Sequence, residues 1–587
     1  MRQFLITIIG TVFGIFAFIL SLILIFVFIG GIGAFSESLK PKDSYILTLD
    51  MRRSMIDHDS GQSSLFGSTP TSVVSTVRAL KRAKNDNYIK GVFIRAESFG
   101  MTPASAEELR LALLDFKESG KFVIAHAQGF ETTSIIPFHA VSAADEIWMQ
   151  DTTGFAVSGL RSESEFYGGV FEKFDAQPQI EQFYEYKNAA NIYTQTGYTE
   201  AHKEATTSYL TSIYDNAMEQ IAEDRSIPLE KLTAFFNTSP HSAEDAKAAG
   251  LVDKLGHIET AKKYAQKKAG GDKIKFQTAS AYGVGINVTG ETIAFIGGQG
   301  PVVDGVSSSG SPFNSGLSMG GDTIAKAFDA AIKDKKVKAI VFRVSTPGGS
   351  PAASDQILAA TDRAKEAGKP VVISMGKYAA SGGYYVSAHA DHIVALPSTI
   401  TGSIGVVGGK VAFEDTFAKI GYNIDGITIG GDYAGAYSAD EPFNPSQREA
   451  YRGQLEDIYD DFTTRVANGR DIPLERVKEI AKGRVWTGKQ AKEIGLVDEL
   501  GGFFTAIEAA KKLAEIDEDT KIRIKTFPRP KTTQQQLEEI LSSSVQMQKD
   551  IQALREITEL PEVQAALRAR QASKIGQELQ ADIPEVK

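Results

Sequence analysis

Two glycine-rich segments that contain serines have the residue types of a hydrolytic site. The first is Ser345–Ser350 (STPGGS), and the second is Ala380–Tyr385 (ASGGYY). Ser381 would lie at the start of a helix, where backbone N–H groups are unpaired and the helix dipole is positive. Taken singly, either segment fits an ordinary tight turn. Their position after consecutive apolar runs favours nucleophilic catalysis by Ser381.

Backbone N–H groups beside this serine could stabilise a tetrahedral oxyanion. Glycines allow the backbone to approach a substrate closely. Gly382 follows Ser381 directly, and Gly348 and Gly349 lie in the neighbouring turn. We therefore expect these three glycines to form an oxyanion and substrate-backbone site.

A base for the serine is not evident among the histidines. His389 and His392 follow Ser381 by eight and eleven residues. On one helix they would lie about 12 Å or more along the axis, out of reach of the hydroxyl. Four others are scattered without an evident aspartate partner: His126, His139, His202 and His257. A Ser-x-x-Lys motif occurs at Ser374–Lys377, but this motif requires a helical turn, whereas Ser374 ends a predicted strand.

The elements that must position these segments alternate between short apolar runs and amphipathic helices. In the second half of the chain the pattern predicts strands at 292–296, 337–344 and 370–375, and helices at 322–333 and 354–367. Such alternation predicts an α/β fold with a mainly parallel sheet and helices on its faces. In this class of fold the chemistry lies at the carboxyl ends of the strands.

The chain contains an internal duplication. Residues 246–261 match residues 491–506 at ten of sixteen positions, and 224–232 resembles 469–477 at the same offset of 245 residues. A repeat of this length is far longer than that of a solenoid and indicates two tandem copies of one domain. We place the copies at about residues 45–270 and 290–525.

The two ends of the chain differ from these copies. No charged residue occurs between Gln3 and Ser36. A membrane span needs about 20 apolar residues, and a cleaved signal peptide has only about 7–15, so we expect an uncleaved transmembrane anchor at residues 4–30. Basic residues lie on both sides of this run, so the positive-inside rule does not decide its orientation. The polar, glutamine-rich residues 531–587 predict an appended helical tail.

Composition excludes several classes of function. The chain has no cysteine and a net charge of -10. The first property excludes thiolate catalysis and disulfides, and the second argues against binding to nucleic acid. No metal-ligand motif such as His-Glu-x-x-His occurs, so we expect no metal and no cofactor.

The glycine-rich segments, together with the Thr-Gly-Ser-Ile-Gly stretch that contains Ser403, resemble the signal peptide peptidase A family of the protease IV type. The resemblance covers roughly residues 45–525 and extends to the Clp protease and crotonase superfamily. It implies a tandem duplication of a Clp protease/crotonase-like domain. It also implies that Ser381 is the nucleophile, that a lysine in a Tyr-Lys-x-Ala stretch, here Lys187, is the base, and that Ser403 orients this lysine.

The duplication supports the assignment of Lys187 independently. The matching place in the second copy is Gly431–Ala434, and no lysine occurs between Lys419 and Lys478. The first copy in turn has no Ser-Gly-Gly near 131–136. Each copy therefore retains what the other lacks. A lysine base must also be desolvated, because an ammonium with a pKa near ~10.4 carries no free lone pair at neutral pH.

The resemblance implies a membrane-bound serine endopeptidase that degrades cleaved signal peptides and other apolar peptides through an acyl-enzyme. It further implies a homotetramer at the bacterial inner membrane, crossing it once, with its catalytic domains in the periplasm. Two alternatives are a crotonase-like acyl-CoA enzyme and a non-catalytic membrane scaffold. Neither explains both Ser381 and Lys187.

Overall fold

The computed structural model describes residues 43–59, 71–96, 100–282, 290–311 and 314–529. None of the helices in these ranges is long and apolar enough to cross a membrane. The predicted anchor at 4–30 and the predicted tail at 531–587 lie outside the described residues.

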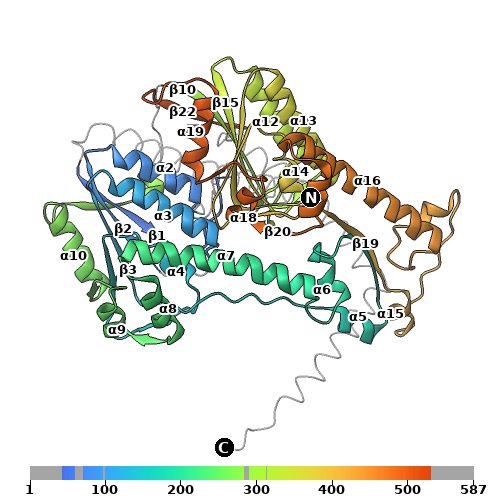
Figure 1. The fold of residues 1–587 in the computed structure, drawn as a ribbon, viewed down its shortest axis with the longest axis horizontal. Coiled ribbons are helices and arrows are strands. Elements are labelled where there is room, and N and C mark those ends of the chain that lie inside the picture. The colour runs from blue at the N-terminus through green and yellow to red at the C-terminus, as the bar shows by residue number, and fades with distance from the viewer. Residues whose placement is uncertain (1–42, 60–70, 97–99, 283–289, 312–313, 530–587) are drawn as a thin grey trace, which may run out of the picture. The chain divides into compact units, whose positions relative to one another are not determined.

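The described chain divides into two compact units (Figure 1). The first contains the residues up to Met55, Ser75–Ser162 and Ile213–Ile286. The second contains Ile56–Val74, Glu163–Ser212 and the chain from Asn287 onward. Residues 163–212 of the first sequence copy therefore pack in the same unit as the second copy. The domain boundaries at 45–270 and 290–525 stay a prediction.

The first unit is built on a six-stranded parallel sheet with the order β8-β4-β3-β2-β1-β9. Its strands are β1 (Tyr45–Asp50), β2 (Ile89–Arg95), β3 (Phe122–Ala127), β4 (Glu146–Met149), β8 (Lys254–Leu255) and β9 (Lys275–Thr278). Helix α10 (Ile258–Ala269) packs Ala261 and Ala265 against Ile46, Phe93 and Ile124 of this sheet. Small residues on the helix allow this close approach to the larger strand side chains.

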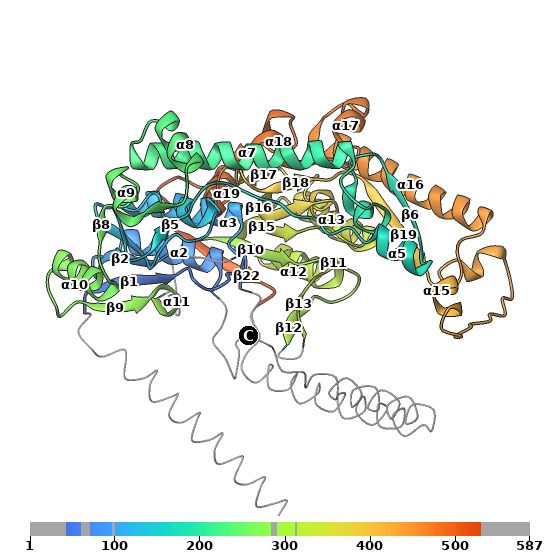
Figure 2. The same cartoon turned by 90° about the horizontal axis from the view of Figure 1, so that it is seen from below.

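The second unit is built on an eight-stranded sheet, in which β10, β15, β16 and β17 lie side by side (Figure 2). Its strands are β10 (Glu291–Gln299), β15 (Val337–Thr346), β16 (Val371–Ala380), β17 (His392–Ala395), β18 (Ile400–Gly402), β20 (Val485–Thr487), β21 (Glu499–Leu500) and β22 (Ile522–Phe527). All pairs are parallel except β18–β20.

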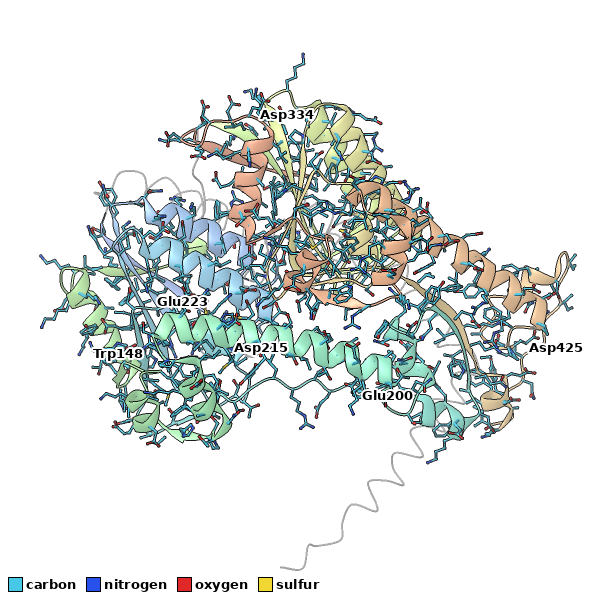
Figure 3. All side chains as sticks on the ribbon, viewed as in Figure 1. Trp148, Glu200, Asp215, Glu223, Asp334 and Asp425 are labelled. Atoms are coloured by element: carbon cyan, nitrogen blue, oxygen red, sulfur yellow. The ribbon has the colours of Figure 1, made fainter. Side chains whose placement is uncertain are left out.

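Strand order confirms the duplication in three dimensions. The order β21-β17-β16-β15-β10-β22 of the second unit repeats β8-β4-β3-β2-β1-β9 of the first, element for element along the chain. Helices α7 (Glu200–Arg225) and α16 (Pro445–Arg470) are also equivalent, since both have 26 residues and begin 245 residues apart. In Figure 3, Glu200 marks the start of α7. The α/β fold with tandem copies is therefore as predicted.

Helices cover both faces of the second sheet. Alternate residues of β15 enter different cores because strand side chains point to opposite faces. Ile340 and Phe342 pack with α12 (Gly321–Lys333) and α13 (Pro351–Glu366). Val341 packs with α19 (Phe503–Leu513) on the other face. The sheet and the helices on its two faces therefore form a three-layer unit.

Strand β16 extends further than its apolar run predicts. We expected the strand to end at Met375, but it continues to Ala380 and leads directly into Ser381. The first part of β16 pairs with β17, and the last three residues pair with β18 instead. The change of partner lies around Gly376, where a Cβ atom would lie 2.5 Å from a carboxylate oxygen of Asp57. The expected strand end was therefore wrong, because hydrogen bonding to β18 continues the strand through less apolar residues.

A segment of the first copy joins the second unit by strand pairing. Strand β6 (Gln177–Phe183) pairs antiparallel with β19 (Val406–Ala412) over seven residue pairs. Glu181 of β6 is almost buried, and its carboxylate accepts hydrogen bonds from Arg448 and Arg452 of α16. The strand that leads to Lys187 is therefore fixed to the second unit by both backbone and side-chain contacts.

A buried ion pair gives a test of this architecture. Both Nε and Nη2 of Arg343 donate to the Asp57 carboxylate, at 2.9 and 2.8 Å, and the two side chains are 1% and 2% exposed. Asp57→Asn leaves the Arg343 charge uncompensated, so we expect a loss of about 3–5 kcal/mol of stability. A lower midpoint of thermal unfolding would show it.

The matched control is Glu479→Gln, which removes an exposed ion pair with Arg476. That change should cost no more than about 1 kcal/mol. Equal shifts for the two variants would contradict a special role for the buried pair.

Candidate active site

Ser381 lies in a sharp strand-to-helix turn. It follows β16 directly and precedes the single turn α14 (Gly382–Tyr385), with φ 54° and ψ -119°. Its own N–H donates to the carbonyl of Gly402 at 2.8 Å. A positive φ is uncommon for a serine and is maintained only where the surrounding structure imposes it. Such a turn presents the serine hydroxyl at the end of the sheet, as in other enzymes with a strand–serine–helix arrangement.

The Gly348–Gly349 turn packs directly against this serine. A Cβ atom on Gly348 would lie 2.7 Å from the N atom of Gly382 and 2.8 Å from Cβ of Ser381, so only glycine fits. The N–H of Gly348 donates to Oγ1 of Thr346 at 3.1 Å. The N–H of Val302 donates to the carbonyl of Gly348, and the carbonyl of Val302 accepts the N–H of Ser350. Gly349 lies between these two hydrogen bonds, so its own N–H points away from Val302. Among the described residues, the N–H groups of Gly349 and Gly382 have no protein acceptor.

The amine of Lys187 lies against Ser381. Lys187 precedes the short 3₁₀ helix η2 (Asn188–Ala190). Its Nζ is 2.9 Å from Oγ of Ser381, 3.0 Å from Oγ of Ser403 and 2.8 Å from the carbonyl oxygen of Ser403. The first distance lies in the hydrogen-bonding range that a serine and its base require. All three residues belong to the second compact unit.

Burial changes the ionisation of this amine. Lys187 is only 4% exposed. Desolvation lowers the pKa of Lys187 to about 7, and no carboxylate in the described part of the chain counters it. Gly483 packs against Lys187 and helps to exclude water from it, because a Cβ atom at Gly483 would lie 2.5 Å from Cβ of Lys187. At neutral pH a large fraction of the amine is therefore uncharged.

Ser403 is held in place by strand β18, which precedes it, and by a backbone hydrogen bond to Arg484. It follows β18 with φ 51°, and its N–H donates to the carbonyl of Arg484 at 2.7 Å. This strained conformation turns both its carbonyl and its hydroxyl toward Lys187. The structure thus brings the three side chains of the sequence prediction together, and their catalytic roles stay a prediction.

A cavity of about 710 Å³ opens over Ser381 and Lys187. Its volume is typical of a ligand site. One wall is apolar and includes Tyr385, Leu455, Ile458 and Phe462. Gly349 and Gly382, whose N–H groups have no acceptor among the described residues, also line the cavity.

The two histidines near Ser381 in sequence do not reach the site. We expected both on one helix with Ser381, but α14 ends at Tyr385 and His392 begins β17. His389 pairs with Asp362, and His392 pairs with Glu499. That placement was wrong, although the exclusion of both as bases agrees with their partners.

The Ser-x-x-Lys alternative also fails on geometry. Ser374 is 1% exposed, and its hydroxyl accepts a hydrogen bond from Arg343. Lys377 is exposed on the same strand, β16. Residues three apart on a strand point to opposite faces, so the two side chains cannot form a pair.

His202 and Tyr209 line the cavity, although the sequence set His202 aside as a scattered histidine and did not indicate Tyr209. Both lie on α7, seven residues apart and thus on one face of the helix. The available sign was this spacing on a helix that follows Lys187 closely. Among the described residues, Nδ1 of His202 is buried without a hydrogen-bond partner.

The position equivalent to Ser381 in the first copy is not a serine, and the position equivalent to Lys187 in the second copy is not a lysine. In the first unit Ile135 precedes α4 (Ile136–His139) and donates its N–H to Gly159, as Ser381 does to Gly402. Its φ is -67°, so the strained turn is absent there. In the second copy Gly431 precedes η3 (Asp432–Gly435) as Lys187 precedes η2.

Comparison with known proteins assigns the family. A model of peptidase family S49 matches residues 115–272 and again 363–517. The chain is 32% identical to Protease 4 of Salmonella typhi over 476 residues, which are 77% of this chain and 74% of the relative. It is 30% identical to Protease 4 of Haemophilus influenzae, covering 86% and 84%, and 30% identical to the chloroplastic serine protease SPPA of Arabidopsis thaliana, covering 78% and 68%.

The matches confirm the resemblance inferred from the glycine-rich segments. They favour neither the acyl-CoA enzyme nor the non-catalytic scaffold, because the family and all three relatives are named as peptidases or proteases. Both copies of the duplication carry the family match, and one of them carries the Ser381 turn. The chain belongs to peptidase family S49 and is a serine peptidase.

Proposed function

We propose that this serine peptidase is a membrane-anchored endopeptidase that cleaves apolar peptides with a Ser381–Lys187 dyad oriented by Ser403. The observation that carries the proposal is the 2.9 Å contact between Nζ of the buried Lys187 and Oγ of Ser381. A serine hydroxyl is a weak nucleophile until an adjacent base removes its proton. No other titratable side chain contacts this hydroxyl in the described part of the chain.

The three contacts of Nζ fit an uncharged amine. A neutral amine has two N–H donors and one lone pair. The carbonyl oxygen of Ser403 can only accept, so it takes one N–H. The Ser403 hydroxyl takes the second, which leaves the lone pair facing the hydroxyl of Ser381. Ser403 therefore orients the base for proton abstraction.

Acylation then proceeds with Lys187 as the proton carrier. The lone pair of Nζ takes the proton of Ser381, and Oγ attacks the carbonyl carbon of the substrate peptide bond. The N–H groups of Gly349 and Gly382 stabilise the resulting oxyanion. Gly349 suits this role better than Gly348, whose N–H is bonded to Thr346. The ammonium returns its proton to the leaving amine, the C–N bond breaks, and an acyl-enzyme remains.

Deacylation repeats these steps with water. The neutral amine accepts a proton from a water molecule, which attacks the ester carbonyl. The tetrahedral intermediate collapses, the proton returns to Oγ of Ser381, and the carboxylic acid product leaves. The same base and the same backbone donors therefore serve both halves of the reaction.

The substrate class follows from the cavity and from the predicted anchor. The wall formed by Tyr385, Leu455, Ile458 and Phe462 favours apolar side chains over charged ones. Cleaved signal peptides are apolar peptides left in the membrane, and an anchor at residues 4–30 would hold the enzyme near them. We further propose a homotetramer whose catalytic units lie in the periplasm.

The anchor has a direct test. We expect the full chain to sediment with the inner membrane after an alkaline wash, and a chain that starts at Asp43 to be released. The difference follows from about 20 apolar residues spanning the bilayer. Release of the full chain by the same wash would contradict the anchor.

Removal of the base should abolish turnover while leaving the fold intact. Lys187→Met keeps the length and the apolar stem, so we expect kcat for an apolar peptide to fall by about 10²–10⁴ with little change in KM. Ser381→Ala should abolish both hydrolysis and labelling by a fluorophosphonate. The control is Lys336→Met, which changes an exposed lysine in the turn before β15. Turnover of Lys187→Met near that of the control would contradict the dyad.

The pH dependence should report the same amine. Because burial lowers the pKa of Lys187 to about 7, the uncharged base accumulates above that pH. We expect kcat/KM to rise through an apparent pKa near 7 and then level off. A profile still rising in proportion to hydroxide above about pH 9 would indicate an unperturbed lysine.

The lowered pKa of Lys187 should also make the stability of the folded protein depend on pH. Between pH 7 and the unfolded value of 10.5, the unfolded chain binds more protons at Lys187, so stability rises with pH there. Lys187→Met removes this dependence. It should therefore raise the thermal midpoint most at or below pH 7, and hardly at all above about pH 10.5.

A further inference from the structure

Arg484 connects the segment that carries Lys187 with the turn that carries Ser403. Its side chain reaches helix α7, and its main chain lies at the start of β20. We infer that Arg484, held by Glu204, is a positioning residue that fixes Lys187 and Ser403 relative to Ser381. This inference rests on the proposed Ser–Lys function.

The side chain of Arg484 forms a paired and stacked contact. Its Nη1 and Nη2 donate to the two carboxylate oxygens of Glu204, at 2.5 and 2.8 Å. The guanidinium lies 4.8 Å from the ring centre of Tyr186 and 4.5 Å from that of Trp486. Planar stacking and a two-bond fork are specific to arginine, since lysine offers neither. Tyr186 is thus held next to Lys187.

The main chain around Arg484 holds both partners of the amine. The carbonyl of Arg484 accepts the N–H of Ser403 at 2.7 Å, and the carbonyl of Lys482 accepts the N–H of Tyr186 at 3.2 Å. Between them, Gly483 has φ 79° and packs on Lys187, where a Cβ atom would lie 2.6 Å from both the N and Cα atoms of Lys187. The three residues 482–484 therefore contact both sides of the base.

The size of the expected effects separates positioning from stability. The Glu204 side chain is 52% exposed and that of Arg484 is 14% exposed, so water screens the ion pair at its Glu204 end and we expect the pair to contribute about 1 kcal/mol to stability. Catalysis is more sensitive, because a displacement of about 1 Å can cost about 10²-fold in rate. The contacts of Arg484 with Glu204, Tyr186 and Trp486 are called the clamp below. Loss of the clamp should therefore lower the rate of catalysis much more than it lowers the unfolding temperature.

The test compares two variants that keep different properties of the pair. Arg484→Lys keeps the charge but loses the planar fork, and Glu204→Gln keeps the shape but loses the charge. For both we expect fluorophosphonate labelling of Ser381 to slow by about 10- to 100-fold, with KM for an apolar peptide nearly unchanged. Both should also move the acid limb of the pH profile upward, because a loosened Lys187 gains water and is protonated more easily.

Three results would overturn the inference. Wild-type labelling by Arg484→Lys would mean that only the charge matters. A downward shift of the acid limb for Glu204→Gln with no shift for Arg484→Lys would also indicate a direct effect of charge, because only Glu204→Gln changes the charge. Wild-type labelling by Glu204→Gln would show that the clamp is not needed. Thermal unfolding verifies that each variant is folded, and if Arg484→Lys does not fold, Glu204→Gln decides.

Glu185→Gln is the matched control. It removes an exposed ion pair with Lys482, at 3.5 Å, which joins the segment that carries Lys187 to residues 482–484 without the stacking. Its labelling rate should equal that of the wild type, and an equal loss would overturn the role of Arg484. Lys187→Met separates the two proposals. If it is labelled at the wild-type rate, the dyad fails; if it is inactive while the clamp variants are normal, only the positioning role fails.

Discussion

The desolvation of one amine is the constraint on which the rest of the site depends. A lysine in water has a pKa near ~10.4 and cannot act as a base at neutral pH. Burial lowers the pKa of Lys187 to about 7, and none of the carboxylates that the structure describes restores its charge. The cover that excludes water comes from Ser381, Ser403 and Gly483, all in the second sequence copy. Lys187 belongs to the first copy, and it is desolvated where residues of the two copies meet within one compact unit.

The remaining features of the site follow from this requirement. Strand β6 must extend along β19 to deliver Lys187, and β16 must change partners to bring Ser381 beside it. Both Ser381 and Ser403 have a positive φ, and both direct a side-chain oxygen at Nζ. Each such conformation costs about 1–3 kcal/mol, so it persists only where neighbouring hydrogen bonds impose it. For these two residues the bonds are those to Gly402 and Arg484.

Local sequence signals predicted the parts of this structure that local physics determines. The apolar runs predicted strands β10 and β15 and the helices between the strands. The glycines of the Ala380–Tyr385 segment pointed to the strand-to-helix turn at Ser381, because such a turn needs glycine at fixed positions. Lys187 needed the family resemblance, since a lone lysine in a loop has no local signature. Arg484 and the pairing of β6 with β19 were not predictable, because both depend on contacts more than 200 residues apart in sequence.

The same energetics explain why, among the described residues, the positions equivalent to Ser381 and Lys187 in the other copy carry different residues. A buried lysine lowers stability at neutral pH, and a serine at positive φ adds strain; each is useful only when its partner is present. A buried lysine or a strained serine without its partner would lower stability and gain nothing in the proposed reaction. The equivalent positions agree with this, since Gly431 carries no amine and Ile135 has an ordinary φ of -67°. The asymmetry of the two copies is therefore what we expect if backbone strain and a buried lysine are retained only where the proposed Ser381–Lys187 dyad needs them.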